Sequence, residues 1–354
     1  MFKPDNFKSK IIVRAQLPFY KLDPDTHFLL YDKQLESLYS EEFDLQDFVE
    51  SFPHRLGLKA GEPLKSFRDF PKNLETVLKP WPQPVKRSHT LVALGGGSLG
   101  DFAGFVASIL KRGVGLIHIP STWLAAMDSA HGGKNALNMA GAKNQIGTFY
   151  PAQKVFVVKE LLESSPRELK EQAYGELIKM ALIGESQFFR EIIEERRPVE
   201  DFMWRFMKNC IEDKYHVILQ DPYESKTIRQ TLNFGHSLGH ALESHFEWPH
   251  GDSVLQGIFF SLEWSRYRGL LSQVGYDKIM SVISEKFSRG PAYEFRWYRK
   301  PALKAIERLL LADKKINDQG QLNFVFLKGV GKPSVQPVLL TDLLSEAKRQ
   351  GWIK

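Results

Sequence analysis

The segment that most constrains the fold is a glycine-rich turn between an apolar run and a helical pattern. Residues 91–104 read LVALGGGSLGDFAG, so a β-rich run leads through Gly95, Gly96, Gly97 and Gly100 into a predicted helix. Glycines allow a tight turn and let backbone N–H groups approach an anion at the start of a helix. The spacing satisfies G-x-G-x-x-G, which purely structural turns also satisfy. The segment therefore predicts a strand–turn–helix unit of an α/β fold, with a dinucleotide pyrophosphate as its candidate ligand.

A dinucleotide at this turn would also need a carboxylate to hold a ribose. The usual acidic residue about 20 positions further on is missing, because residues 115–120 contain no carboxylate. Asp32, at the end of an earlier predicted strand, is the best-placed candidate.

The first half of the chain alternates β-rich and helical patterns, and the second half is dominated by helical patterns. Strands are predicted over residues 11–16, 28–31, 90–94, 115–119, 154–158 and 321–327. Helices are predicted over residues 166–183, 201–219, 227–246, 253–274, 301–311 and 339–350. Because 354 residues exceed one ordinary core, we expect two domains. They are an α/β, Rossmann-like nucleotide-binding domain over 1–160 and an all-α metal- and substrate-binding domain over 161–354.

Cysteine content and charge narrow the function classes. The single Cys210 excludes an internal disulfide and a Cys-based zinc site, so any metal must be held by histidines and carboxylates. The net charge of +6 is spread along the chain rather than gathered in a basic stripe. This even distribution of basic residues argues against nucleic-acid binding. It is compatible with an ordinary solvated surface or with a pocket that binds an anionic small molecule.

The N-terminal ten residues are charged and lack the apolar core of a secretory signal. The longest apolar run, residues 102–110, is too short to span a bilayer. We therefore expect a cytoplasmic protein that does not bind membranes.

Residues 229–240, RQTLNFGHSLGH, carry a polar stripe at helical spacing. Arg229, Asn233, His236 and His240 lie at i, i+4, i+7 and i+11, which would place them on one face of the predicted helix. Core leucines usually occupy such positions. Four polar residues in register predict instead that this face lines a polar cavity.

Neighbouring residues extend this pattern to a metal site. Gly235 and Gly239 each cost about 1 kcal/mol of helix propensity, which indicates that another element packs close to the backbone. His250 opens the next predicted helix, and Glu176 lies upstream with Lys179 on the same face. One carboxylate and two imidazoles leave a position open, as catalytic zinc sites do. No glutamate follows the first histidine directly, so the protease motif H-E-x-x-H is excluded, and spacing alone does not decide which histidines are ligands.

Residues 119–150 are rich in glycine and small polar residues, which is typical of a pocket rather than a core. The candidate pocket residues are Asp128, Lys134, Lys143 and Asn144, with Arg112 just upstream. The lysines and the asparagine suit phosphate and carboxylate oxygens, and Arg112 adds another cation. A solvated loop with incidental lysines is the alternative.

Together these segments resemble 3-dehydroquinate synthase, a family of the sugar-phosphate cyclases within the wider fold of iron-dependent alcohol and glycerol dehydrogenases. The resemblance extends from about Asp32 to the last predicted strand. It is carried by GGGSLGDFAGF, RGVGLIHIPST, MDSAHGGK, GAKNQIGTFY, GELIKMALI, LNFGHSLGHALE and HGD. It implies the dehydroquinate synthase-like fold.

The resemblance also implies residue roles. The zinc ligands would be Glu176, His236 and His250. The substrate-contacting and pocket residues would be Asp128, Lys134, Lys143, Asn144, Lys179, Lys214, Arg229, Asn233 and His240, with one lysine of the pair Lys314 and Lys315. The NAD-binding residues would be Asp32, Glu62, Lys65, Gly95, Gly96, Gly97, Asp101, Ser121 and Thr122. Arg112 would reach the site of a second subunit, which implies a homodimer.

The implied reaction is the cyclisation of 3-deoxy-D-arabino-heptulosonate 7-phosphate to 3-dehydroquinate and phosphate, a step of the shikimate pathway towards aromatic amino acids. It would use bound NAD catalytically and a zinc ion, with cobalt as an alternative metal. Oxidation, phosphate elimination, reduction and intramolecular aldol closure would follow one another. The sequence departs from the family pattern at His131 and Asn135 beside Lys134, at Asp252, and at Pro222 next to Asp221. These changes leave the fine substrate specificity open.

Three alternatives stay open at this point. Another sugar-phosphate cyclase, acting on sedoheptulose 7-phosphate or glucose 6-phosphate, would have less use for a carboxylate-binding set. A metal-dependent polyol dehydrogenase of the same fold would release NADH and would need fewer cations. A catalytically silent scaffold would be expected to lack a metal ligand, and Glu176, His236 and His250 are all present.

Overall fold

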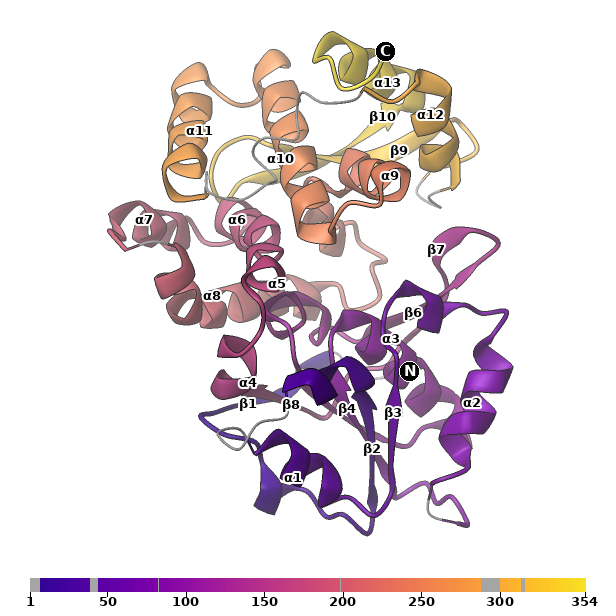
Figure 1. Ribbon diagram of the computed structural model, residues 1–354. Coiled ribbons are helices and arrows are strands. Elements are labelled where there is room, and N and C mark those ends of the chain that lie inside the picture. The colour runs from indigo at the N-terminus through magenta and orange to yellow at the C-terminus, as the bar shows by residue number, and fades with distance from the viewer. Residues whose placement is uncertain (1–6, 39–43, 82, 198, 288–299, 313–315) are drawn as a thin grey trace. The chain divides into compact units, whose positions relative to one another are not determined.

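The computed structural model describes residues 7–38, 44–81, 83–197, 199–287, 300–312 and 316–354 (Figure 1). The chain forms two compact units, Met1–Leu169 and Lys170–Lys354. The sequence prediction placed the division earlier, at residue 160. The difference is the short helix α4 (Lys159–Glu163) and the segment after it, which belong to the first unit.

The first unit is built on a six-stranded parallel sheet with the strand order β1-β8-β5-β4-β2-β3 (Figure 1). The strands are β1 (Lys10–Arg14), β2 (His27–Asp32), β3 (Arg55–Leu58), β4 (Thr90–Gly95), β5 (Gly115–Pro120) and β8 (Lys154–Val158). All six residues of β4 are buried, which explains its uninterrupted apolar sequence, since helices cover both faces of such sheets. Five of these strands were predicted. The four-residue β3 was not, because Gly57 interrupts its apolar pattern where it packs against Tyr31.

Helices and a hairpin complete the first unit. The longer helices are α1 (Leu45–Glu50), α2 (Phe70–Leu78) and α3 (Gly97–Ile109), and α5 (Arg167–Glu171) lies at its boundary. Short helical turns are η2 (Phe19–Lys21), η3 (Lys33–Leu38), η4 (Glu62–Lys65), η5 (Leu110–Arg112) and the π-helical η6 (Ala125–Ser129). Strands β6 (Lys134–Met139) and β7 (Ala142–Phe149) pair as an antiparallel hairpin. The glycine-rich segment of residues 119–150 is therefore largely ordered secondary structure.

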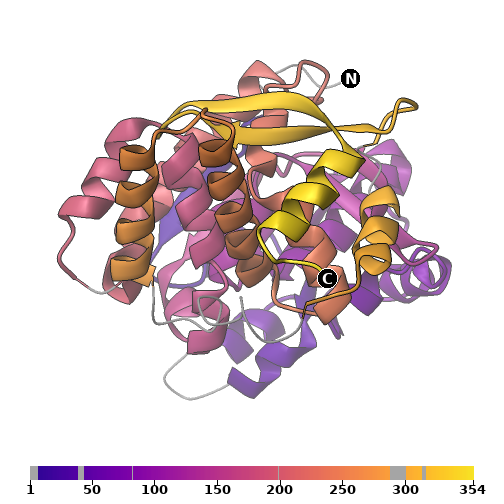
Figure 2. The same ribbon diagram turned by 90° about the horizontal axis from the view of Figure 1, so that it is seen from above.

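The second unit is helical, which together with the parallel sheet confirms the predicted fold class. Its helices are α6 (Tyr174–Ile183), α7 (Ser186–Glu194), α8 (Val199–Gln220), η7 (Arg229–Asn233), α9 (His236–Phe246), α10 (His250–Tyr267), α11 (Gln273–Phe287), α12 (Leu303–Ala312) and α13 (Leu340–Arg349). It also contains an antiparallel hairpin of β9 (Gln321–Leu327) and β10 (Pro333–Leu339), of which only β9 was predicted. Figure 2 shows this hairpin beside α13. The hairpin packs on α10 through Trp264, whose ring centroid lies 4.7 Å from that of Phe324 and 5.1 Å from that of Phe326.

The prediction of one continuous helix over residues 227–246 is wrong, because the helix is interrupted at Gly235. Gly235 has a left-handed backbone with φ of 80°, so η7 ends before it and α9 begins after it. Arg229 and Asn233 therefore do not share one continuous helical face with His236 and His240. The predicted helix over 166–183 is likewise divided into α5 and α6.

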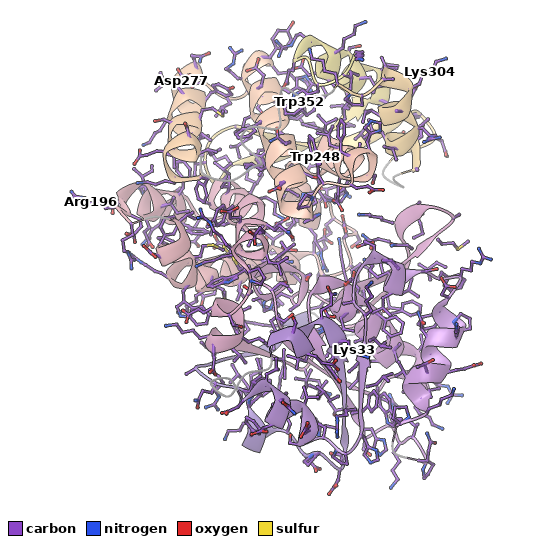
Figure 3. The ribbon with its side chains drawn as sticks, viewed as in Figure 1. Lys33, Arg196, Trp248, Asp277, Lys304 and Trp352 are labelled. Carbon is purple, nitrogen blue, oxygen red and sulfur yellow. The ribbon has the colours of Figure 1, made fainter. Side chains whose placement is uncertain are left out.

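The charged surface of the second unit is mixed in sign. Figure 3 shows Arg196, Asp277 and Lys304 at its periphery, and all three are exposed. In the part of the chain that the structure describes, no helix is both long enough and apolar enough to cross a membrane.

The buried His118 on β5 predicts a pH-dependent stability. Its side chain faces α3 at Gly100, and burial lowers its pKa from 6.5 to about 4. Because the unfolded chain then binds more protons between these pH values, the stabilisation is complete above about pH 6.5 and is lost as the pH falls towards 4. The loss should be about 3 kcal/mol. Urea unfolding of the wild type and His118→Gln at several pH values measures it, and parallel pH profiles of the two proteins would contradict the assignment.

Candidate metal and nucleotide sites

The second unit contains a buried carboxylate between two imidazoles. Glu176 lies on α6, a helix whose ten residues are all buried, and only 1% of its surface is exposed. Its Oε1 is 3.4 Å from Nε2 of His236 and 3.3 Å from Nε2 of His250. Its Oε2 forms an ion pair with Nζ of Lys179, one turn further along α6. These four side chains come from three helices, α6, α9 and α10, and form one polar cluster.

Glycines allow the three helices to approach closely enough for this cluster. A Cβ on Gly251 would lie 1.6 Å from the carbonyl oxygen of Gln172, and one on Gly175 would lie 2.1 Å from that of Gly251. On α9, a Cβ on Gly239 would lie 2.7 Å from the carbonyl oxygen of Ser253. The close packing predicted at Gly235 and Gly239 is therefore confirmed, and the packed element is α10.

The electrostatics of the cluster favour a negative Glu176. Burial would raise the pKa of its carboxyl, but the ammonium of Lys179 and the hydrogen bonds to His236 and His250 hold that pKa well below its usual range. Burial, followed by the charge of Lys179, lowers the pKa of His236. For His250, burial is outweighed by Glu176 and Glu243, which raise its pKa to about 10. The site is therefore a buried anion that attracts positive charge to its imidazole side.

A third histidine and a second carboxylate adjoin the cluster. His240 lies one turn after His236 on α9, and the nearest ring nitrogens of His236, His240 and His250 lie within 4.8 Å of one another. Glu243 lies on the same helix, and its Oε2 is 2.9 Å from Nδ1 of His250. This bond fixes the orientation of the His250 ring and leaves Nε2 directed at Glu176. A carboxylate bonded to the far nitrogen of an imidazole is the usual support of a metal-binding histidine.

The loop between α8 and η7 positions the buried Arg229, which is the first residue of η7. Asp221 is fully buried, and its carboxylate accepts backbone N–H bonds from Ser225 (2.8 Å), Lys226 (3.1 Å) and Arg229 (3.1 Å). These bonds outweigh burial and lower the pKa of Asp221. The guanidinium of Arg229 donates to the carbonyl oxygen of Pro222. Asp221 therefore organises the loop that presents Arg229.

Two further predicted residues belong to this unit. Lys214 is buried on α8, and Asn233 donates from Nδ2 to Oε1 of Glu224 at 3.4 Å. Lys314 and Lys315 lie outside the described residues.

In the first unit, the predicted dinucleotide residues gather at one edge of the sheet. Asp32 ends β2, Gly95 ends β4 and Ser121 follows β5, and these three strands are neighbours in the sheet. The carboxyl edge of a parallel sheet is where nucleotides bind in open α/β folds. A Cβ on Gly95 would lie 3.4 Å from Cβ of Asp32, and one on Gly96 would lie 3.3 Å from Cγ2 of Thr122.

The glycine turn is also crowded on its other side. A Cβ on Gly97 would lie 2.9 Å from Oγ of Ser129, so bare backbone is required at the first residue of α3. The 13-residue helix α3 directs its first N–H groups at this edge. The turn therefore has the form of a pyrophosphate cradle.

The remaining NAD candidates form a buried ion pair. Lys65 on η4 is 4% exposed, and its Nζ lies 2.6 Å from Oδ2 of Asp101 on α3 and 2.7 Å from Oδ1 of Asn144 on β7. Glu62 accepts a bond of 2.7 Å from Nδ2 of Asn138 on β6. Segment 62–65 is thus connected both to the nucleotide edge and to the hairpin.

The remaining predicted residues of the first unit lie on the β6–β7 hairpin and in two ordered turns. Lys134 begins β6 and Lys143 lies on β7, and both are exposed. Asp128 lies in the π-helical η6, a type of turn that is frequent at functional sites. Arg112 is exposed and, like Lys111, has a left-handed backbone, with φ of 61° and 50°.

Three residues that sequence reasoning did not assign emerge here: Glu243, Asp221 and Asn138. Glu243 lies seven residues after His236 and three after His240, so helical spacing could have indicated it. The bonds of Asp221 and Asn138 depend on loop and hairpin geometry that the sequence pattern does not encode.

Comparison with solved structures shows which proteins share this fold. A 2-deoxy-scyllo-inosose synthase complexed with carbaglucose-6-phosphate, NAD+ and Co2+ matches with a TM-score of 0.79 at 24% identity, covering 96% of each chain. A 2-epi-5-epi-valiolone synthase from Streptomyces hygroscopicus subsp. jinggangensis, with NAD+ and Zn2+ bound, matches with a TM-score of 0.77 at 20% identity, covering 97% of each chain. At these identities the likeness shows the fold alone, which this chain shares with both synthases.

The sequence comparisons show the family to which the chain belongs. The families described as 3-dehydroquinate synthase N-terminal and C-terminal match residues 55–172 and 173–316. A 3-dehydroquinate synthase of Alkaliphilus metalliredigens is 32% identical over 325 residues, which cover 90% of this chain and 87% of the relative. The chain belongs to the 3-dehydroquinate synthase family, and the resemblance stated from its motifs is confirmed.

The glycine contacts predict that Gly257→Ala destabilises the second unit. In the interior of α10, alanine should gain about 1 kcal/mol of helix propensity. A Cβ there would lie 1.7 Å from the carbonyl oxygen of Gly235, so α9 must move and overpacking should cost about 1 to 3 kcal/mol net. The midpoint of urea unfolding measures the change. Gly275→Ala on α11 is the matched control, since its nearest neighbour is the serine hydroxyl of Ser272 at 3.1 Å, and equal midpoints for the two variants would contradict the prediction.

Proposed function

We propose that this protein is a 3-dehydroquinate synthase. It converts 3-deoxy-D-arabino-heptulosonate 7-phosphate into 3-dehydroquinate and phosphate with a bound NAD and a zinc ion, for which cobalt can substitute. Family membership supports the reaction, and the spacing of the donor atoms around Glu176 supports the metal. The relatives of the same fold that are solved with NAD+ and with Zn2+ or Co2+ support the cofactors.

The donor spacing carries the metal proposal. Ligand atoms about 2.0 to 2.1 Å from a tetrahedral zinc ion lie about 3.3 to 3.4 Å from one another. Oε1 of Glu176 lies 3.4 and 3.3 Å from Nε2 of His236 and His250. Both separations from Glu176 therefore match a tetrahedral site held by these three residues, which would leave a fourth position available for substrate oxygen.

His240 is the alternative third ligand, since its ring also lies near His236 and His250. Glu176 is the better candidate, because its Oε1 lies within 3.4 Å of both imidazole nitrogens, whereas Lys179 pairs with Oε2 and leaves Oε1 facing the histidines. We therefore assign His240 to the substrate and Glu176, His236 and His250 to the metal, with Glu243 orienting His250.

The cofactor proposal rests on the nucleotide edge of the first unit. The bare backbone of Gly95, Gly96 and Gly97 would hold the pyrophosphate, and Asp32 would accept hydrogen bonds from a ribose. Ser121 and Thr122 supply hydroxyls at the same edge, where Glu62, Lys65 and Asp101 complete the proposed set. When bound, the nicotinamide would accept and return a hydride, and the metal would polarise a substrate oxygen.

The residues of the chain would mainly position the substrate and balance its charge. Arg229 and Asn233 would bind the carboxylate, and Lys214 and His240 the hydroxyls. The ammonium groups of Lys134 and Lys143, with the amide of Asn144, would hold the phosphate end until it leaves. Asp128 would line the pocket, where its carboxylate can accept a hydrogen bond from a substrate hydroxyl. Lys179 would keep Glu176 ionised. This distribution suits a substrate that carries both a carboxylate and a phosphate, which favours the heptulosonate over sedoheptulose 7-phosphate, glucose 6-phosphate or a polyol.

We also propose a cytoplasmic homodimer in which Arg112 of one subunit completes the site of the other. The exposed left-handed turn at Lys111 and Arg112 supports it, since strained backbone is retained where it serves a function.

The activity test is incubation of the purified protein with NAD, zinc and the heptulosonate phosphate. We expect stoichiometric phosphate and 3-dehydroquinate, identified by mass, without accumulation of NADH. His250→Ala and Glu176→Ala should lose turnover together with bound zinc, which elemental analysis measures, because each removes one donor of three. Full activity and zinc content in either variant would contradict the ligand assignment, and no turnover by zinc-loaded wild type would exclude this substrate.

Mixing two inactive variants tests the contribution of Arg112. A subunit with Arg112→Ala retains its own metal ligands but has no arginine for the site of its partner. A subunit with His250→Ala has an incomplete metal site but still supplies Arg112 to its partner. After subunit exchange at equal concentrations, half of the dimers are mixed, and each has one complete site. The mixture should therefore recover about a quarter of wild-type activity. Recovery near zero, with mixed dimers shown by differently tagged subunits, would exclude a shared site.

A further inference from the structure

Asn138 of the β6–β7 hairpin makes three connections, and no role has so far been assigned to it. Its Nδ2 donates to Oε2 of Glu62 at 2.7 Å, and its Oδ1 accepts from the backbone N–H of Asn144 at 2.9 Å. Its carbonyl oxygen accepts from the backbone N–H of Phe67 at 2.8 Å. A register shift of the hairpin lies between Leu137 and Met139, at Asn138 itself. Such a bulge redirects a residue away from its own hairpin, here towards the segment that follows η4.

The hairpin is held at two places by different parts of the first unit. At its base, Asn135 donates to the carbonyl oxygens of Gly133 (3.0 Å) and Tyr150 (2.9 Å). The same side chain packs against α3 so closely that a Cβ on Gly104 would lie 1.8 Å from its Oδ1. Further out, Asn138 and Asn144 connect the hairpin to segment 62–67.

Asn144 is fixed from two sides by that segment. Its side-chain oxygen accepts from Nζ of the buried Lys65, and its backbone N–H donates to Asn138, which in turn is bound to Glu62. Its left-handed backbone, with φ of 55°, is thereby held in place. Any ligand that fixes Glu62 and Lys65 therefore also fixes Asn144 and the outer part of the hairpin.

We propose that Asn138 is a positioning residue that couples the binding of the dinucleotide to that of the sugar phosphate. This inference rests on the proposed function, in which Glu62 and Lys65 bind NAD, whereas Lys134, Lys143 and Asn144 hold the phosphate end. A dinucleotide that orders segment 62–65 lowers the conformational cost of ordering the hairpin. The second ligand then binds more tightly, and by linkage each ligand raises the affinity of the other by the same factor.

The test measures this factor with NAD and a phosphonate analogue of the heptulosonate phosphate. Its CH2 group replaces the ester oxygen, so phosphate cannot be eliminated. The Kd of the analogue is determined by calorimetry with and without saturating NAD, on zinc-loaded protein, and the ratio of the two Kd values is the coupling factor. For the wild type we expect a factor above about 5.

Asn138→Ala should reduce that factor at least about threefold, because both side-chain connections are removed. Asn138→Asp is the second variant. It keeps the acceptor for Asn144 but places a carboxylate against Glu62, so the factor should fall there as well. Met139→Ala is the matched control on the same hairpin, since that side chain is 47% exposed, and it should retain the wild-type factor.

The outcomes separate this inference from the proposed function. If the Asn138 variants keep the wild-type factor, or if the wild type binds both ligands with a factor of one, the coupling role is overturned while the proposed function stands. Equal weakening of both ligands with an unchanged factor assigns Asn138 a merely structural role and overturns the inference too. A wild type that binds neither ligand overturns both proposals.

Discussion

The buried carboxylate of Glu176 is the interaction on which the second unit depends. A charge with 1% exposure is costly unless cations and hydrogen bonds replace its lost hydration. Lys179 supplies a cation to Oε2, and the imidazoles of His236 and His250 face Oε1. The imidazole side thus concentrates negative potential in a space bounded by nitrogen donors, which is the condition for holding a divalent cation. An apolar residue at position 176 would remove the carboxylate oxygen that both histidine side chains face.

That arrangement requires backbones to approach more closely than ordinary side chains permit. Gly175 and Gly251 bring α6 and α10 together, and Gly235 and Gly257 do the same for the junction of η7 and α9 with α10. At each contact a backbone carbonyl oxygen lies within 2.8 Å of the position that a Cβ would occupy, so the positions of the proposed metal ligands are fixed by backbone packing. Loops alone would leave these side chains free to separate, whereas donors at fixed spacing bind a metal without a large ordering cost. The left-handed Gly235 also ends one helical segment and starts the next, which turns His236 towards Glu176.

Much of this could be predicted from the sequence, wherever a local pattern determines the structure. The apolar runs of β4, β5 and β8 predicted buried parallel strands, and the glycine turn after β4 predicted the strand–turn–helix unit. The break at Gly235 could not be predicted, because a left-handed glycine and a helical glycine look alike in sequence and only the packing of α10 distinguishes them. The β6–β7 hairpin was missed because its residues are polar and half-exposed, so they lack the alternation that indicates a strand. The candidate site residues of the second unit were predicted from motifs rather than from a correct helix.

Three residues that depart from the family pattern, His131, Asn135 and Asp252, hold backbone segments near the candidate sites or are buried. His131 is buried, with Nε2 at 2.9 Å from the carbonyl oxygen of Ala126, and so braces the π-helical turn that carries Asp128. Asn135 closes the base of the hairpin through backbone carbonyl groups. Asp252 is buried at the start of α10, where burial and then Glu171 raise its pKa to about 6. Because His131 and Asn135 bind backbone and Asp252 is buried, their replacement changes how firmly the loops are held more than which groups face a ligand. The cationic residues proposed to contact substrate keep the family pattern, so the substrate class should be retained while binding strength differs.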